Sequence, residues 1–274
     1  MKQGRQRGWR VMTLLVLALA IAGAAVYSWT VRHQRRPVRE SRVESLPQLP
    51  EACRFETHEG AGYIACVLDP HSVRFRLYLA RPDRQAYGAV PAFLDAMAGA
   101  GTVPLIAMNA GMYHADMTPV GLFVDEGRET AALELADGDG NFYLKPNGVF
   151  FIDSSGRAGV METQAFAGSG LTARLATQSG PMLVIDGEVH PKFLADGTSR
   201  YIRNGVGVRA DGAVVLAISR EAVSLGAFAR AFRDGFGCPD ALFLDGGISA
   251  FAAYGQMVTG GTDKSGPILA VFAK

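Results

Sequence analysis

The alternation of apolar and polar residues predicts a series of short strands from residue 62 to the C-terminus. In residues 72–80, Val73, Phe75, Leu77 and Leu79 face one side, and the residues between them are mostly polar. This period of two is typical of a half-buried strand. Comparable runs predict strands at residues 62–69, 104–108, 120–124, 141–144, 149–152, 159–163, 181–185, 205–209, 214–218, 241–244 and 267–272. Glycine-containing turn pairs separate several of them.

Two segments have the signals of a helix. Residues 91–98 (PAFLDAMA) predict a short helix that ends at Gly99. Residues 225–236 predict an amphipathic helix with Ser224 as its N-cap. Many strands, few helices and no internal repeat predict a single α+β (mixed α/β) domain over residues 51–274, with a mostly mixed β-sheet core.

The N-terminal segment has a different pattern. Residues 11–29 form a run of nineteen residues without a charge, and a membrane-spanning helix needs about 20 apolar residues. The short basic start and the Ala-Gly-Ala run at 22–24 also fit a cleavable secretory signal. The length of the run favours an uncleaved signal anchor over residues 1–30, followed by a linker over 31–50. We therefore expect residues 11–29 to lie in the inner membrane and the domain to be periplasmic or extracellular, or secreted if the signal is cleaved.

Charge is distributed unevenly along the chain. The net charge is +1, but nine of the 27 Lys and Arg residues and one of the 26 acidic residues lie in residues 1–42. The remaining chain therefore carries a net charge of −7. An acidic body repels phosphate backbones, which argues against nucleic acid as a partner.

The three cysteines include no CxxC pair, so no zinc quartet is predicted. If the domain is exported, Cys53 and Cys66 can pair as a disulfide across two adjacent strands; the alternative is two reduced, buried thiols. Cys238 precedes Pro239 and the apolar run ALFL, which is typical of a buried structural thiol. No cofactor or metal site is predicted, although a calcium site of carboxylates and amides requires no motif and stays open.

Two predicted buried strands end in a polar residue that leads into glycine. Asn109 ends one strand and Asp245 ends the other, where Gly246 and Gly247 follow. Ligands of open α/β sheets bind beyond the carboxyl ends of buried strands. Glycine permits close backbone approach, and its amides can meet an anion. Asx turns at two strand ends are the alternative.

Three further polar clusters contain glycine, in the runs KPNG, TQSGP and SRYIRNG. A turn explains each cluster by itself, but five such clusters in one domain indicate a common site. The planar guanidinium of Arg203 suits a phosphate group, Lys145 can neutralise an anion, and His114 can exchange a proton or orient a substrate. The candidate catalytic residues are Asp245, Asn109 and Arg203. The candidate substrate-binding residues are Gln178, Ser179, Gly180, Asn204, Gly246, Gly247, Ser249, His114, Lys145 and Asn147.

The runs MNAGMYHADMTPVGLFVDEG, PNGVFF, TQSGPMLVIDG, IRNGVGV and LDGGIS occur in an order that resembles the phosphodiester glycosidase family. The resemblance spans residues 109–250. It implies hydrolysis of the bond between a sugar's anomeric carbon and a phosphodiester oxygen, with a sugar-phosphate or glycan as the ligand. Ile248 replaces a glycine of the family pattern and Ala250 replaces a serine, which favours a different sugar or leaving group.

The resemblance also implies roles for individual residues. Asp245 acts as base for water, as nucleophile or as acceptor for sugar hydroxyls, and Asp116 is the nearest candidate for a second carboxylate. The leaving phosphate is a weak base, so donors such as Arg203 and Lys145 stabilise its charge. Two rival hypotheses are an envelope module that binds sugar-phosphate or cell-wall glycan without turnover, and a structural exported domain.

Overall fold

The computed structural model describes residues 47–195 and 197–274, and residues 47–274 form one compact unit. The expected signal or membrane segment (1–30) and most of the expected linker (31–50) lie outside the described residues. Within the described ranges, every helix is too short or too polar to cross a bilayer.

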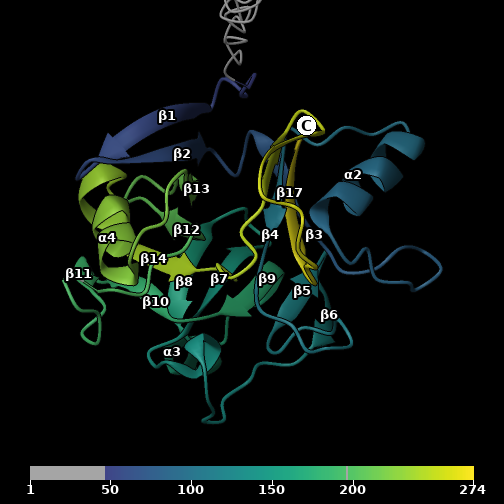
Figure 1. Cartoon of the computed structure of the whole chain (residues 1–274). Coiled ribbons are helices and arrows are strands. Elements are labelled where there is room, and N and C mark those ends of the chain that lie inside the picture. Colours follow the sequence, from purple (N-terminus) through teal and green to yellow (C-terminus); the bar gives the residue numbers. More distant parts are fainter. Residues whose placement is uncertain (1–46, 196) are drawn as a thin grey trace, which may run out of the picture. The chain divides into compact units, whose positions relative to one another are not determined.

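The described strands form three sheets, and every pairing among them is antiparallel (Figure 1). The seven-stranded sheet has the order β1 (Cys53–His58), β2 (Ala61–Leu68), β13 (Val214–Ser219), β12 (Asn204–Val208), β14 (Asp240–Phe243), β10 (Met182–Ile185) and β11 (Glu188–Val189). The second sheet has the order β16 (Gln256–Thr259), β15 (Phe251–Ala253), β4 (Ile106–Asn109), β17 (Ile268–Ala273) and β3 (Val73–Tyr78). The third has the order β6 (Arg128–Ala131), β5 (Phe123–Asp125), β9 (Ala173–Ser179), β7 (Gly148–Asp153) and β8 (Ala158–Glu162).

The sheets share one apolar core, and short helices cover their outer faces. Phe75, Met108, Phe150 and Leu216 come from all three sheets and belong to the same buried cluster. The helices and helical turns are α2 (Val90–Gly99), η1 (Asn141–Tyr143), α3 (Thr163–Gly168), α4 (Leu225–Arg230) and η2 (Ala231–Gly235). Figure 1 shows α2 beside β3 and β17, and α4 beside the seven-stranded sheet. The domain is therefore of the α+β class, as predicted.

One predicted element is wrong in type, and one predicted helix changes its form along its length. Residues 141–144 form the 3₁₀ turn η1 instead of a strand, because Tyr143 and Leu144 donate their amides three residues back. The predicted helix 225–236 changes at Ala231 into the π-helical turn η2, in which Phe236 N donates to Ala231 O at 2.8 Å. The wider turn brings Phe236 against Tyr63, at 5.8 Å between ring centroids.

The prediction also placed one strand start too early and overlooked other elements. Residues 120–122 precede β5, because the Leu122 amide donates to the side-chain Oε1 of Gln178 on β9 instead of a backbone carbonyl. Strand β9 was interpreted as part of a polar turn, yet it pairs with β5 and β7 and is buried from Leu175 to Ser179. Strands β1, β6, β11, β15 and β16 and helix α3 were not predicted.

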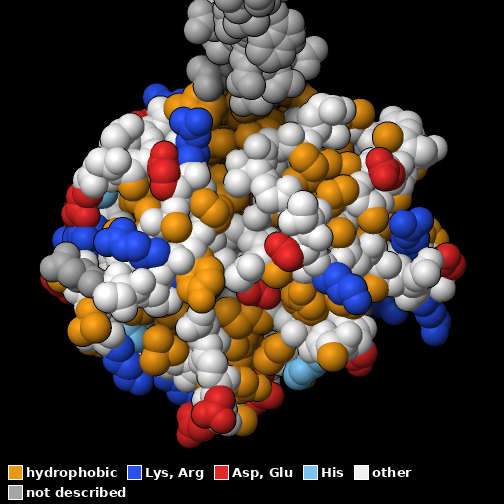
Figure 2. Space-filling model, viewed as in Figure 1, with side chains coloured by type: hydrophobic (Ala, Val, Ile, Leu, Met, Phe, Trp, Pro, Cys, Tyr) orange, Lys and Arg blue, Asp and Glu red, His pale blue; other side chains and the backbone are white. Residues whose placement is uncertain are grey.

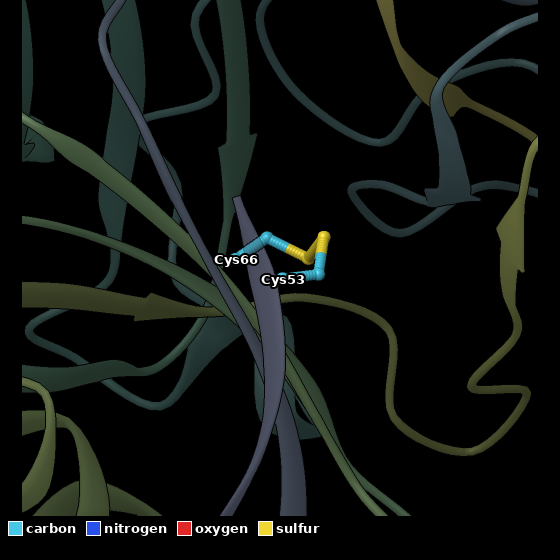
Figure 3. The surroundings of a disulfide bond; sticks show 2 residues. All are labelled: Cys53 and Cys66. Atoms are coloured by element: carbon cyan, nitrogen blue, oxygen red, sulfur yellow. A yellow bond between two sulfur atoms is a disulfide. The ribbon is translucent and has the colours of Figure 1, made fainter. Parts of the chain in front are cut away.

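The structure assigns a state to each of the three cysteines. Cys53 and Cys66 are register partners in the β1–β2 pair and form a disulfide (Figure 3). This decides between the two alternatives for this pair. Cys238 is free and buried, and burial raises the pKa of its thiol to about 12. A thiol with that pKa stays protonated and is a poor nucleophile, so its predicted structural role is confirmed.

Candidate functional site

The two polar strand ends at residues 109 and 245 lie next to each other. Asp245 N donates to Ala110 O at 3.1 Å, and Asn109 Nδ2 donates to Asp245 O at 2.6 Å. Strand β4 belongs to one sheet and β14 to another. The chain leaving β14 therefore crosses between two sheets, where it is attached to the end of β4.

Both polar atoms of the Asn109 side chain have hydrogen-bond partners in this attachment. Its Oδ1 accepts a hydrogen bond from Ala250 N at 2.9 Å, while Nδ2 contacts the carbonyl of Asp245. Asn109 is buried, at 1% exposure. It therefore holds both ends of the segment 245–250 in place and does not present its amide to a ligand.

Asn204, on β12, and Ser249, in the segment between β14 and β15, extend the same network. Asn204 Nδ2 donates to Asn109 O at 2.9 Å, and Ser249 Oγ lies 2.9 Å from Asn204 Oδ1 and 3.0 Å from Ile202 O. Both side chains are buried. A buried polar network with all its members paired is rigid, so it positions the Asp245 segment with little freedom.

Asp245 is the member of the network with spare hydrogen-bonding capacity. Its carboxylate is half-buried, and Gly247 N donates to Oδ1 at 3.4 Å. Burial raises the pKa of the Asp245 carboxyl, against the smaller opposite effect of the Gly247 amide. A carboxylate with a raised pKa is a candidate for proton exchange with a substrate.

Tyr113 is a neighbour that the sequence interpretation overlooked. Burial raises the pKa of its phenol, and the charges of Asp245 and Asp263 raise it further. Its hydroxyl donates to Lys264 O at 2.7 Å. The run NAGMY could have indicated this residue, because it places an aromatic side chain four positions after Asn109.

Close approach at Gly111 connects this network to β9. A Cβ at Gly111 would lie 2.4 Å from Gln178 O and 2.9 Å from Thr177 Oγ1. Glycine is therefore required for the loop after β4 to pack on that strand. Gly246 is also buried, against the Phe243 ring, whereas Gly247 is exposed.

The Gln178 side chain points to the other face of β9. Its Oε1 accepts from Leu122 N at 3.0 Å and from Glu134 N at 2.8 Å, and its Nε2 donates to Glu134 O at 2.7 Å. These bonds fasten the loop around residue 134. Gln178 thus shapes the surroundings of the site, and its amide has no capacity left for substrate.

Ser179 and Asn147 lie at the joined ends of β9 and β7 and keep hydrogen-bonding capacity. Ser179 Oγ and Asn147 Oδ1 are buried and have no partner within the described part of the chain. Asn147 Nδ2 donates to Phe142 O at 2.9 Å, and a Cβ at Gly180 would lie 2.7 Å from Asn147 Cβ. Buried polar atoms are normally paired, so these two are candidates for ligand contact.

The predicted cations have protein partners. Arg203 Nε donates to Val223 O at 2.8 Å and Nη2 to Ser199 O at 2.9 Å, and burial lowers the pKa of this guanidinium to about 10. Lys145 Nζ lies 2.7 Å from Asp137 Oδ1 and 3.0 Å from Leu135 O. Among the described residues, neither cation forms an ion pair with Asp245.

His114 and Asp116 belong to an exposed turn. His114 O accepts from Met117 N at 2.8 Å, and Asp116 Oδ1 accepts from Thr118 N at 3.0 Å and from its hydroxyl at 2.6 Å. The Thr118 bonds lower the pKa of the Asp116 carboxyl. Asp116 therefore closes its own turn, and nothing in the described contacts makes it a second carboxylate for Asp245.

Two further observations concern the charge on the viewed face and the capacity to hold a metal ion. Figure 2 shows a viewed face whose centre is mostly uncharged, with Lys and Arg side chains in separate groups. His, Cys, Asp and Glu side chains of residues 47–195 and 197–274 form no group of three that could hold a metal ion. The expectation that nucleic acid is not a partner stays a prediction. The alternative of a calcium site that needs no motif also stays open.

Comparison with known proteins identifies the family. Residues 103–268, more than half of the chain, match the family model described as phosphodiester glycosidase. The chain therefore belongs to the phosphodiester glycosidase family, and the resemblance read from its motifs is confirmed. The matched region contains both Asn109 and Asp245.

One curated relative and two solved structures are similar to this chain. The uncharacterized protein YigE of Escherichia coli (strain K12) is 34% identical over 185 residues, which are 68% of this chain and 72% of that protein. The catalytic domain of zebrafish N-acetylglucosamine-1-phosphodiester alpha-N-acetylglucosaminidase, auto-inhibited by its pro-peptide, has a TM-score of 0.58 at 14% identity and covers 81% of this chain and 82% of that one. A hypothetical protein from Synechocystis has a TM-score of 0.53 at 16% identity, covering 81% of this chain but 61% of that one. The structural likeness establishes a shared fold.

Proposed function

We propose that this protein hydrolyses glycosyl-phosphodiesters, in which a sugar is joined through its anomeric carbon to a phosphodiester oxygen. Membership of the family supports a hydrolase of phosphodiester-linked sugars. The observation that carries the proposal is the half-buried Asp245, held by Asn109 and by the end of β4 within the region that matches the family.

In the proposed reaction, water attacks the anomeric carbon and gives a proton to Asp245. The bond between that carbon and the phosphodiester oxygen breaks, and its electron pair leaves with a phosphate monoester. The raised pKa of Asp245 brings this base nearer to neutral pH. Ser179 and Asn147 offer polar atoms to the sugar or the phosphate.

We also propose that the domain works outside the cytoplasm, anchored in the inner membrane through residues 11–29. The Cys53–Cys66 disulfide supports export, because disulfides persist in oxidising compartments. A cleaved signal would give a secreted protein with the same domain.

The test uses the full chain in detergent and a glycosyl-phosphodiester in ¹⁸O-labelled water. We expect the label in the anomeric hydroxyl of the released sugar. Label in the phosphate would mean that a phosphorus–oxygen bond is cleaved, and no product from any of a panel of glycosyl-phosphodiesters would refute hydrolysis.

Substitution separates the role of Asp245 from a general charge effect. Asp245→Asn should lower kcat at least tenfold, which corresponds to about 1.4 kcal/mol in the barrier. Asp95→Asn removes an exposed carboxylate on α2 and should leave kcat unchanged. A loss of less than tenfold in Asp245→Asn would remove Asp245 from the reaction.

A second candidate function is binding of a sugar-phosphate or glycan without turnover. The engagement of Arg203 and Lys145 by protein groups favours it, because both were expected to stabilise the leaving phosphate. Calorimetric titration with a sugar 1-phosphate, followed by product analysis, distinguishes the two. Heat of binding without any product in the phosphodiester panel would support this candidate.

A further inference from the structure

A site for a phosphodiester needs a cation that the residues named so far do not provide. The substrate carries a negative charge, and hydrolysis leaves a phosphate monoester with more charge on its oxygens. The guanidinium of Arg203 is buried against protein carbonyls, and Lys145 is paired with Asp137. The charges around Tyr113 are negative, since the carboxylates of Asp245 and Asp263 both raise the pKa of its phenol.

Three segments lie side by side at this point. Ala110 N donates to Pro267 O at 2.8 Å, while Ala110 O accepts from Asp245 N at 3.1 Å. The backbones at 245 and 267 therefore both contact residue 110. The segment before Pro267 is thus next to the candidate site.

Tyr113 fixes the loop that leads into this segment. Its hydroxyl donates to Lys264 O at 2.7 Å, and a Cβ at Gly266 would lie 2.5 Å from its ring. The start of the same loop contacts the chain after Asp245, since a Cβ at Gly260 would lie 2.0 Å from Ser249 O. The loop 260–266 is therefore attached to the site at both ends.

We propose that the ammonium group of Lys264 binds the phosphate of the substrate, and that Tyr113 is the residue that positions it. The backbone of Lys264 is held by Tyr113, but its side chain is exposed and its Nζ has no hydrogen bond or ion pair with any residue in the described ranges. A flexible four-carbon stem carries this charge, so it can reach a phosphate beside Asp245. The assignment rests on the proposed function and supplies its missing cation.

The experiment compares Lys264→Gln with Lys274→Gln in the full chain. Lys274 is a matched control, because it follows β17 at the opposite end from Lys264 and contacts His71. The probes are a glycosyl-phosphodiester for turnover and its non-hydrolysable phosphonate analogue for calorimetric binding. Lys264→Gln should weaken binding of the analogue and raise KM for the substrate, each about tenfold. It should also make both quantities less dependent on salt concentration. Lys274→Gln should match the wild type.

Tyr113→Phe tests the positioning role. It keeps the aromatic ring and removes the hydrogen bond to Lys264 O. We expect an intermediate rise in KM, and no further rise when it is combined with Lys264→Gln. Additive effects of the two substitutions would show that Tyr113 acts independently of Lys264.

The outcomes separate this inference from the proposed function. If the wild type turns over substrate or binds the analogue, and Lys264→Gln behaves like Lys274→Gln, then Lys264 is not the phosphate ligand and the proposed function stands. If the wild type neither binds nor hydrolyses either probe, the proposed function and this inference are both refuted. Binding without turnover that depends on Lys264 would support the inference and the binding candidate together.

Discussion

Removal of the Cys53–Cys66 disulfide should lower the free energy of unfolding by about 3 kcal/mol. The two cysteines are 13 positions apart, and the entropy of closing a loop of this size in the unfolded chain corresponds to about 3 kcal/mol at 25 °C. For a domain of this length, that loss lowers Tm by roughly 6–12 °C. The expected change is therefore large enough to measure by thermal denaturation.

The measurement compares the oxidised wild type, the reduced wild type and a Cys53→Ala/Cys66→Ala variant. Reduction removes the covalent bond but leaves both buried sulfur atoms in place, so it isolates the cross-link. The variant also loses buried sulfur and should be less stable than the reduced wild type. Alkylation after unfolding should label one thiol before reduction, which is Cys238, and three after it.

Two results would contradict this reasoning. Three alkylated thiols in protein extracted from cells without reduction would mean that the pair is not oxidised in the cell and would remove the support for export. One alkylated thiol together with an unchanged Tm on reduction would mean that the unfolded chain gains no freedom when the bond is broken.

Two further substitutions test individual side chains of the site. Because burial raises the pKa of Asp245, the folded state binds the proton more tightly than the unfolded state, and this carboxylate lowers stability as pH rises through its folded pKa. Asp245→Asn should therefore raise the urea midpoint at pH 7 and change it little at pH 3; an equal or lower midpoint at pH 7 would contradict the burial argument. Lys145→Gln removes a salt bridge to the exposed Asp137, worth at most about 1 kcal/mol; we expect KM for a glycosyl-phosphodiester to change less than twofold, and a rise of tenfold would restore Lys145 as a substrate ligand.

The local pattern of the sequence predicted much of the fold. Period-two alternation placed β3, and short apolar runs placed β4, β7, β13, β14 and β17, because each signal depends on residues within one strand. The order of the motifs identified the family. Strand β9 was missed because its buried polar residues, Thr177, Gln178 and Ser179, resemble a turn when they are considered without their partners.

The sequence also singled out Asn109 and Asp245, but through an argument from parallel sheets. The described sheets are antiparallel, and the two residues come from different sheets. They meet because both Ala110 O and the Asn109 amide bind the backbone at 245. The prediction thus selected two residues that are neighbours in the structure, but the reason that it gave for their proximity does not apply to these sheets.

What the chain determines locally is which residues are polar, which alternate and where glycine permits close approach. What the tertiary structure decides is what each polar group touches, since the partners of Asn109 lie 95 to 141 positions away. The tertiary contacts make Asn109 and Gln178 supports and engage Arg203 and Lys145 elsewhere. They also bring Tyr113, whose hydroxyl donates to Lys264 O, near Asp245. Hydrophobic periodicity is a property of neighbours along the chain, whereas a hydrogen bond depends on which distant segments fold together.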